Sequence, residues 1–123
     1  MIWLIGIGGS LGSAARFLLG NYIKNRFQNV IYFPLGTWII NISGSLLLGV
    51  LANLHLTDRI GEWIWFLFGI GFCGAYTTFS TFGYETITLI TSKNGKIALF
   101  YVITSVFLGI LSAAIGFTVA NFV

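Results

Sequence analysis

The residues best suited to chemistry lie between Gly71 and Glu85, in the stretch G-F-C-G-A-Y-T-T-F-S-T-F-G-Y-E. This stretch is the middle of an apolar segment that runs from about residue 60 to residue 91. That segment is longer than the ~20 residues that one helix needs to cross a bilayer, and glycines and hydroxyl residues interrupt it. Irregular backbone at membrane depth marks ion and substrate sites, because protein or water must satisfy it. The stretch therefore predicts a broken helix that holds an ion.

The composition places the chain in a membrane. Of its 123 residues, 57% are hydrophobic and 7% are charged, against about 25% charged in a soluble domain. The net charge of +3 comes from scattered residues without a basic stripe, which excludes nucleic acid as a partner. Cys73 is the only cysteine and His55 the only histidine, and they are distant in sequence, so neither a disulfide nor a transition-metal site is expected. No base, nucleophile and orienting group cluster anywhere, which argues against an enzyme.

Four apolar segments define the elements that position this stretch. They cover about residues 2–22, 36–55, 60–91 and 97–121. The polar connections between them are short and carry these residues: Lys24, Arg26, Gln28, Asn29 and Pro34 in the first, His55, Asp58, Arg59 and Glu62 in the second, and Ser92 to Lys96 in the third. We predict an all-α membrane protein, a single domain over residues 1–123 with four transmembrane helices, the third broken at its middle. Four short helices enclose little interior, so a dimer or larger assembly is expected.

Polar residues form tracks on two of the other segments. Thr37, Asn41 and Ser45 are four residues apart and share one helix face, as do Tyr101 and Ser105 in the last segment. Such residues also serve as glue between helices or bond to their own backbone. Two tracks on separate helices favour a polar path.

The first segment combines close-packing residues with one charge. Gly8 and Gly12 form a G-x-x-x-G pair, which predicts close helix packing in lipid. Arg16 follows them at a depth where a guanidinium pairs, snorkels or serves a pore. Structural and functional roles for Arg16 both remain open.

Two phenylalanines follow the expected break. Phe79 and Phe82 are three residues apart and in line with Glu85. Aromatic residues at helical spacing are usually packing residues, but ring edges carry partial positive charge. The pair could therefore coordinate a small anion without a formal cation.

Three motifs together resemble the CrcB/Fluc family of fluoride channels. The central stretch is similar to the family's G-F-C-G-G-x-T-T-F-S-T-F. G-G-S-L-G-S-A-A-R at Gly8–Arg16 and G-T-W-I-I-N-I-S-G-S at Gly36–Ser45 resemble the first- and second-helix motifs. With length and motif order in agreement, the resemblance covers essentially the whole chain.

The resemblance implies a dual-topology antiparallel dimer with two pores in a prokaryotic plasma membrane, which conducts fluoride passively out of the cytoplasm and lowers its toxicity. The implied partners are fluoride, membrane lipid and a second chain of opposite orientation. The resemblance implies that the carbonyls of Gly74 and Thr77 bind one Na+ shared by two subunits, with Thr78 beside it. It implies that the ring edges of Phe79 and Phe82 and a donor from Asn41 contact fluoride. The other implied site residues are Arg16 near a vestibule and, in the pore, Thr37, Glu85, Tyr101 and Ser105.

Two residues at the break and one in the last segment depart from the family pattern. Ala75 replaces a glycine and Tyr76 replaces a usually aliphatic residue. We expect Ala75 to restrict a backbone that glycine would allow to reach positive φ. Gly109 stands where a polar residue would extend the track of the last segment.

The distribution of basic residues gives a separate inference on orientation. The first and third connections carry Lys24, Arg26, Lys93 and Lys96, whereas the other side carries Arg59 alone. The positive-inside rule then places the first and third connections in the cytoplasm and both termini outside. A bias of this size disfavours insertion both ways, so pairing with a related chain of opposite bias is an alternative to a homodimer.

Two other functions remain open. Small multidrug exporters are also four-helix dimers, but they require a carboxylate in the first helix, where this chain has Arg16. A non-conducting partner subunit of a heterodimeric channel would tolerate apolar replacement of its polar tracks. A channel would lose flux.

Overall fold

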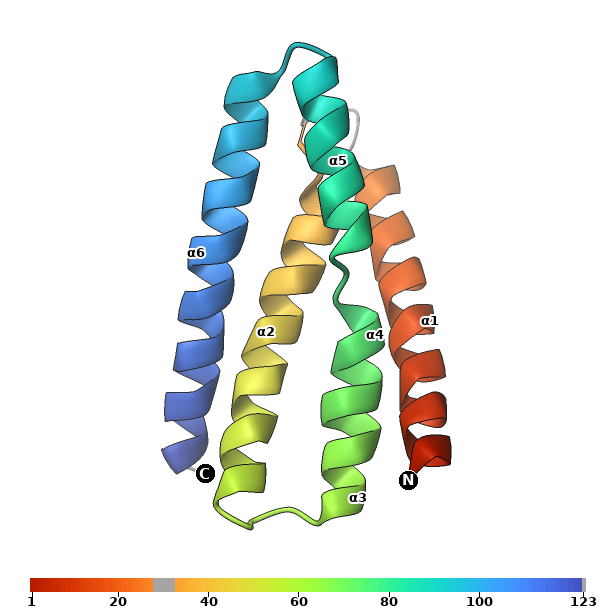
Figure 1. The fold of residues 1–123 in the computed structure, drawn as a ribbon, viewed down its shortest axis with the longest axis vertical. Coiled ribbons are helices and arrows are strands. Elements are labelled where there is room, and N and C mark those ends of the chain that lie inside the picture. The colour runs from red at the N-terminus through yellow and green to blue at the C-terminus, as the bar shows by residue number, and fades with distance from the viewer. Residues whose placement is uncertain (28–32, 123) are drawn as a thin grey trace.

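The computed structural model describes residues 1–27 and 33–122, and every regular element in this part of the chain is a helix (Figure 1). Gln28 and Asn29 of the predicted first connection lie outside the described residues. The elements are, in order, α1 (Ile2–Phe27), α2 (Leu35–Leu56), α3 (Glu62–Ile64), the π-helix η1 (Trp65–Cys73), α4 (Gly74–Tyr76), α5 (Ser80–Thr91), α6 (Gly95–Val119) and the 3-10 helix η2 (Ala120–Phe122).

These elements form four spans that are long and apolar enough to cross a membrane, namely Ile2–Phe27, Leu35–Leu56, Glu62–Thr91 and Gly95–Phe122. The last three agree with the predicted spans to within two residues at each end. The predicted end of the first span was wrong, because α1 continues to Phe27 and includes Lys24 and Arg26 in its last turn. Basic side chains are favourable at a helix C-terminus, where the helix dipole is negative.

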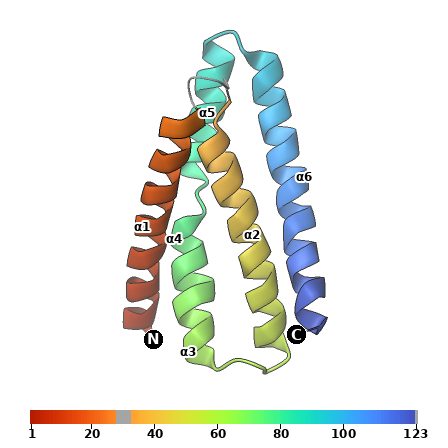
Figure 2. The same cartoon turned by 180° about the vertical axis from the view of Figure 1, so that it is seen from behind.

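The four spans lie side by side, with both chain termini at one end of the molecule (Figures 1 and 2). Glycines allow the backbones of neighbouring helices to touch. An added Cβ would overlap the carbonyl of Leu67 at Gly8, of Phe72 at Gly12, of Ala113 at Gly49 and of Leu46 at Gly116. The close packing predicted at the G-x-x-x-G pair of α1 is confirmed, and the structure shows that the partner is η1; α2 packs against α6 in the same way.

A polar cluster closes the end of the molecule that holds the termini. The Asn53 side chain is 1% exposed, and its Nδ2 donates to the Phe117 carbonyl and to Asn121 Oδ1, the latter at 2.9 Å. Its Oδ1 accepts from Arg59 Nη2 at 3.2 Å. The C-terminal end of α2 is thus tied to the end of α6 and to the connection that follows α2.

The third span is broken at its middle, as predicted, but the break is short. It consists of Thr77 to Phe79, between α4 and α5, and Thr77 is extended with φ −76° and ψ 157°. Gly74 is helical, with φ −62° and ψ −35°, and no glycine in the described part of the chain has positive φ. Ala75 lies within α4, so the restriction expected from its Cβ has no consequence. The break results from the extended backbone of Thr77 and from loss of the helical bond of the Thr78 N–H, which binds Asn41 instead, rather than from glycine flexibility.

Candidate functional site

Asn41 of α2 pairs with the broken backbone. Its Nδ2 donates to the Thr78 carbonyl at 2.9 Å, and its Oδ1 accepts from the Thr78 N–H at 2.8 Å. In a continuous helix the Thr78 N–H would instead donate to the carbonyl of Gly74, four residues earlier. Asn41 therefore satisfies a peptide that has left the helix, and it leaves the Gly74 carbonyl without its helical donor.

The carbonyl groups before the break differ in their bonding. The Cys73 carbonyl accepts from both the N–H and the hydroxyl of Thr77, at 3.1 and 2.8 Å. Gly74 is exposed on the surface of the chain, and an added Cβ there would meet nothing within 4 Å. Hard cations are bound by oxygen ligands, backbone carbonyls included. The Gly74 carbonyl, which lacks its helical donor, and the Thr77 carbonyl three residues on are compatible with the Na+ ligand role that the family resemblance implies for them, and that role stays a prediction.

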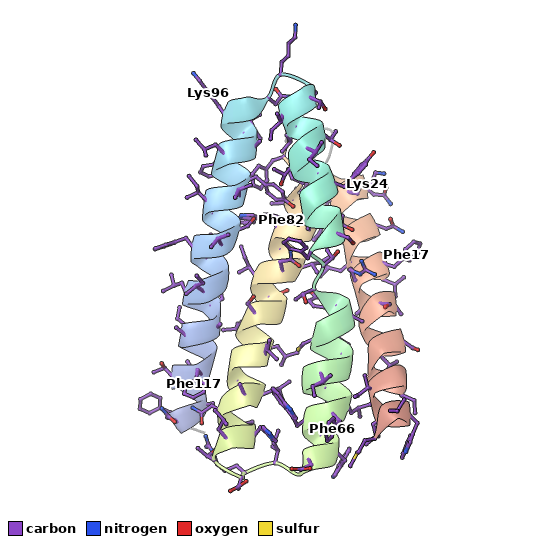
Figure 3. All side chains as sticks on the ribbon, in the orientation of Figure 1. Phe17, Lys24, Phe66, Phe82, Lys96 and Phe117 are labelled. Atoms are coloured by element: carbon purple, nitrogen blue, oxygen red, sulfur yellow. The ribbon has the colours of Figure 1, made fainter. Side chains whose placement is uncertain are left out.

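The two phenylalanines after the break face different environments. Phe79 is 84% exposed, whereas Phe82 is partly buried and its ring lies 5.0 Å from that of Tyr101, between α5 and α6 (Figure 3). The centroids of the Phe79 and Phe82 rings are 6.4 Å apart and their planes are tilted by 39°. The pair therefore runs from the surface of the subunit to its interior.

Glu85, Tyr101 and Thr37 form a polar group next to Phe82. Tyr101 is completely buried, and its hydroxyl donates to Glu85 Oε1 at 3.1 Å. The Thr37 side chain interacts with both of these groups. Ser105 lies one turn beyond Tyr101 on α6, and its hydroxyl oxygen is buried without a hydrogen-bond partner among the described residues. The structure thus brings residues of three separate spans together.

A cavity of about 370 Å³ opens between α1, α2 and α5. Its polar lining consists of Arg16, Asn21, Lys24, Thr37, Thr78, Thr81 and Glu85. Arg16 Nε is buried and has no hydrogen-bond partner in the described part of the chain. Arg16 therefore lines a polar cavity, and its role near a vestibule stays a prediction.

The predicted site residues fall into two groups that share Thr37 and Glu85. Arg16, Thr37 and Glu85 line the cavity, whereas Phe79, Phe82, Asn41, Tyr101 and Ser105 do not. Gly74 and Thr77 lie at the break between the two groups. The roles of all these residues toward fluoride and Na+ stay predictions.

Several residues that the structure places at the site were not predicted from the sequence. Thr81 and Lys24 line the cavity, and Ser43 of α2 bonds to Tyr76 at 3.0 Å. Thr81 was part of the quoted motif, so its spacing could have indicated it. Lys24 was assigned to a connection because α1 was drawn too short.

The family model described as "CrcB-like protein, Camphor Resistance (CrcB)" matches residues 3–117 of this chain. The chain belongs to this family. It is 46% identical over 122 residues to "Fluoride-specific ion channel FluC 2" of Moorella thermoacetica, and the match covers 98% of each chain. It is 42% identical over 114 residues to a protein of the same name from Clostridium acetobutylicum, with 93% of this chain and 92% of the relative covered. "Fluoride-specific ion channel FluC 1" of Carboxydothermus hydrogenoformans is 41% identical over 119 residues, which cover 97% and 92% of the two chains.

Family and structure agree on the class of protein. The relatives are bacterial proteins named as channels, and this chain carries four apolar spans. The chain is a multi-pass protein of the cell membrane and not an enzyme.

Proposed function

We propose that this protein is a fluoride-selective channel that lets fluoride leave the cytoplasm passively. The observation that carries the proposal is the broken third span, in which Phe79 and Phe82 lead from the surface to the Glu85–Tyr101 pair at membrane depth. The comparisons support the proposal, because proteins that are similar to this chain over nearly its whole length are named fluoride-specific ion channels.

The path suits fluoride for electrostatic reasons. Fluoride is small, binds water strongly and accepts hydrogen bonds better than chloride does. Ring edges of Phe79 and Phe82 present partial positive charge, and the hydroxyl of Ser105 is a buried donor without a partner among the described residues. Conduction requires that binding be strong enough to admit the ion but weak enough to release it. The ring edges of Phe79 and Phe82 and the Ser105 hydroxyl attract the ion without a formal positive charge, which meets both requirements along this part of the path.

The cavity supplies the entry to this path. Arg16 and Lys24 line it together with the hydroxyls of Thr78 and Thr81. Cationic side chains at a pore mouth raise the local concentration of anions. The cationic groups lie in the cavity and not beside the phenylalanines, so they attract fluoride without trapping it in the narrow part.

Two copies of the protein in opposite orientation complete the proposed channel. Gly74, Phe79 and Ser80 are exposed on one chain at the break, and irregular backbone at membrane depth must be covered by protein or face water. The carbonyls of Gly74 and Thr77 from two copies would surround one Na+ from both sides. When bound there, Na+ supplies a fixed positive charge and a link between the two broken spans.

The basic residues support a preferred orientation. Lys24 and Lys96 lie at the same end of the molecule (Figure 3). Arg26 is in the last turn of α1 with Lys24, and Lys93 is in the turn between α5 and α6, three residues before Lys96. Arg59 lies in the connection between α2 and α3, at the end that holds the termini (Figure 1). We propose that the end with Lys24 and Lys96 faces the cytoplasm, and that the opposite orientation is supplied by a second copy or by a related chain.

Flux measurements test the function. The purified chain is reconstituted in liposomes loaded with fluoride or chloride, and release is followed with ion-selective electrodes. We expect fast release of fluoride and retention of chloride. Equal release of both anions would contradict selectivity. If folded protein releases neither, co-reconstitution with a chain of opposite charge bias separates a missing partner from a wrong function.

A further inference from the structure

Tyr76 is the last residue of α4, directly before the break. Its side chain is 9% exposed, and its ring stacks on that of Phe72 with centroids 5.6 Å apart and planes at 17°. A tyrosine hydroxyl is a hydrogen-bond donor that an aliphatic side chain lacks. The tyrosine therefore adds one hydroxyl group at the edge of the broken backbone.

The hydroxyl of Tyr76 bonds to α2. It lies 3.0 Å from Ser43 Oγ, and Ser43 Oγ also donates to the Ile40 carbonyl at 3.1 Å. A serine hydroxyl has one proton. Since Ser43 gives this proton to Ile40, the Tyr76 hydroxyl is the donor to Ser43.

Helix α2 consequently holds the break on both sides of Thr77. Asn41 binds the peptide groups of Thr78, after Thr77, and Ser43 binds Tyr76, before it. At Gly44, the next residue of α2, an added Cβ would overlap the Thr77 methyl group and come within 3.1 Å of the Tyr76 ring. The backbone of Thr77 is thus fixed by two side chains and one close approach.

We propose that Tyr76 is a positioning residue, which orients the Gly74 and Thr77 carbonyls toward the bound cation through its hydrogen bond to Ser43. The inference rests on the proposed function, because it concerns the Na+ of that channel. An aliphatic residue at this position would fill space but could not fix the rotation of the α4 end against α2. In this chain the Tyr76–Ser43 hydrogen bond is a second link between α2 and the break, in addition to the hydrogen bonds of Asn41.

The test compares Tyr76→Phe, Ser43→Ala and the double variant with the unchanged chain. Tyr76→Phe keeps the ring and its stacking on Phe72, so the fold is retained. Tyr22→Phe is the matched control for the tyrosine, because Tyr22 is exposed near the end of α1. Ser10→Ala is the control for the serine, because within residues 1–27 and 33–122 the Ser10 hydroxyl bonds only to the Gly6 carbonyl of its own helix.

Two readouts are taken at constant ionic strength, with potassium replacing sodium. The first is the melting temperature of the purified protein as a function of Na+ concentration, and the second is fluoride release from liposomes over the same range. We expect the Na+ concentration for half-maximal stabilisation to rise roughly fivefold in each single variant, as for the loss of one hydrogen bond. The double variant should show the same shift as the single ones, because both remove one shared bond. The controls should match the unchanged chain.

The outcomes separate this inference from the proposed function. An unchanged Na+ midpoint in Tyr76→Phe would overturn the positioning role, whatever the flux. Melting of the unchanged chain that does not depend on Na+ would also overturn it, while selective fluoride release would leave the channel function standing. If Na+ stabilises the unchanged chain but no fluoride is released, the channel function fails and the melting data still decide the role of Tyr76.

Discussion

At the end of the molecule that holds both termini, the helices meet backbone to backbone and bury polar side chains with their partners. Gly49 and Gly116 lie against carbonyls across the α2–α6 contact, and Asn53 is bonded to Phe117, Asn121 and Arg59. At the opposite end, α1, α2 and α5 surround a cavity of about 370 Å³. Arg16 Nε, of a residue that lines this cavity, and Ser105 Oγ, one turn beyond Tyr101 on α6, are buried without hydrogen-bond partners among the described residues.

The difference separates structural from functional polar groups. A buried polar group without a partner costs stability, so a chain keeps such a group only where something repays the cost. At the end with the termini, the bonds of Asn53 offset the cost of burying it. In the proposed channel, an anion that accepts hydrogen bonds would satisfy Arg16 in the cavity and Ser105 next to Tyr101. We therefore expect mutations at the first end to change stability alone, and mutations at the second to change flux as well.

The largest effect is expected at the glycine contacts. Gly49→Ala places a Cβ onto the Ala113 carbonyl and forces α2 and α6 apart, which should cost ~3 kcal/mol or more. The measurement is the yield of monodisperse protein and its melting temperature. Gly6→Ala is the control, since an added Cβ at Gly6 meets nothing within 4 Å. Equal yields for the two variants would contradict the backbone-contact account.

Asn41→Leu is expected to have the next largest effect. It leaves both peptide groups of Thr78 unpaired at membrane depth, and each unsatisfied group costs about 1–3 kcal/mol. We expect a lower melting temperature together with loss of fluoride release. Ser45→Ala is the control for stability on the same helix, because among the described residues the Ser45 hydroxyl bonds only to the Asn41 carbonyl one turn before it. Wild-type stability of Asn41→Leu would show that the break does not depend on α2.

Tyr101→Phe should have a smaller effect on stability than on transport. It removes the hydrogen bond to Glu85, worth about 1 kcal/mol, and keeps the ring that packs against Phe82. We expect a small drop in melting temperature and clearly slower fluoride release in the liposome assay. Tyr22→Phe should change neither quantity. Full flux in Tyr101→Phe would remove Tyr101 from the proposed path.

The smallest effect is expected for Asn121→Ala. Asn53 loses one acceptor but keeps the Phe117 carbonyl, so the cost should be roughly 0.5–1 kcal/mol. Fluoride release should match that of the unchanged chain once both proteins are folded. Slower release at equal stability would show that the end with the termini also takes part in conduction.

Much of the fold follows from the sequence because lipid imposes simple rules. Four apolar runs predicted three spans to within two residues at each end, and the G-x-x-x-G pair predicted a close helix contact, although not that its partner is η1. The end of α1 was misplaced because Lys24 and Arg26 look like loop residues, although a helix can continue beyond the bilayer. The π-helix η1 had no signal in composition or spacing.

The candidate site was predictable in its residues but not in its bonding. Helical spacing placed Thr37 and Asn41 on one face, and the structure shows that Thr37 reaches Glu85 and Tyr101 while Asn41 binds the Thr78 backbone. Whether an amide faces a pore or a peptide depends on how two helices meet, which spacing along one helix does not specify. The bond between Ser43 and Tyr76 was missed for the same reason.

Measuring fluoride release by the Phe82→Ile variant tests most directly the central claim, that fluoride passes along Phe82. The isoleucine keeps an apolar side chain next to Tyr101 but removes the aromatic ring on which the proposed path depends. Folded Phe82→Ile protein and the unchanged chain are reconstituted at equal density, and initial fluoride release is compared with an electrode. We expect the unchanged chain to release fluoride and the variant to be slower by roughly tenfold or more, a barrier increase of about 1.4 kcal/mol. Release at the unchanged rate would contradict a fluoride path along Phe82.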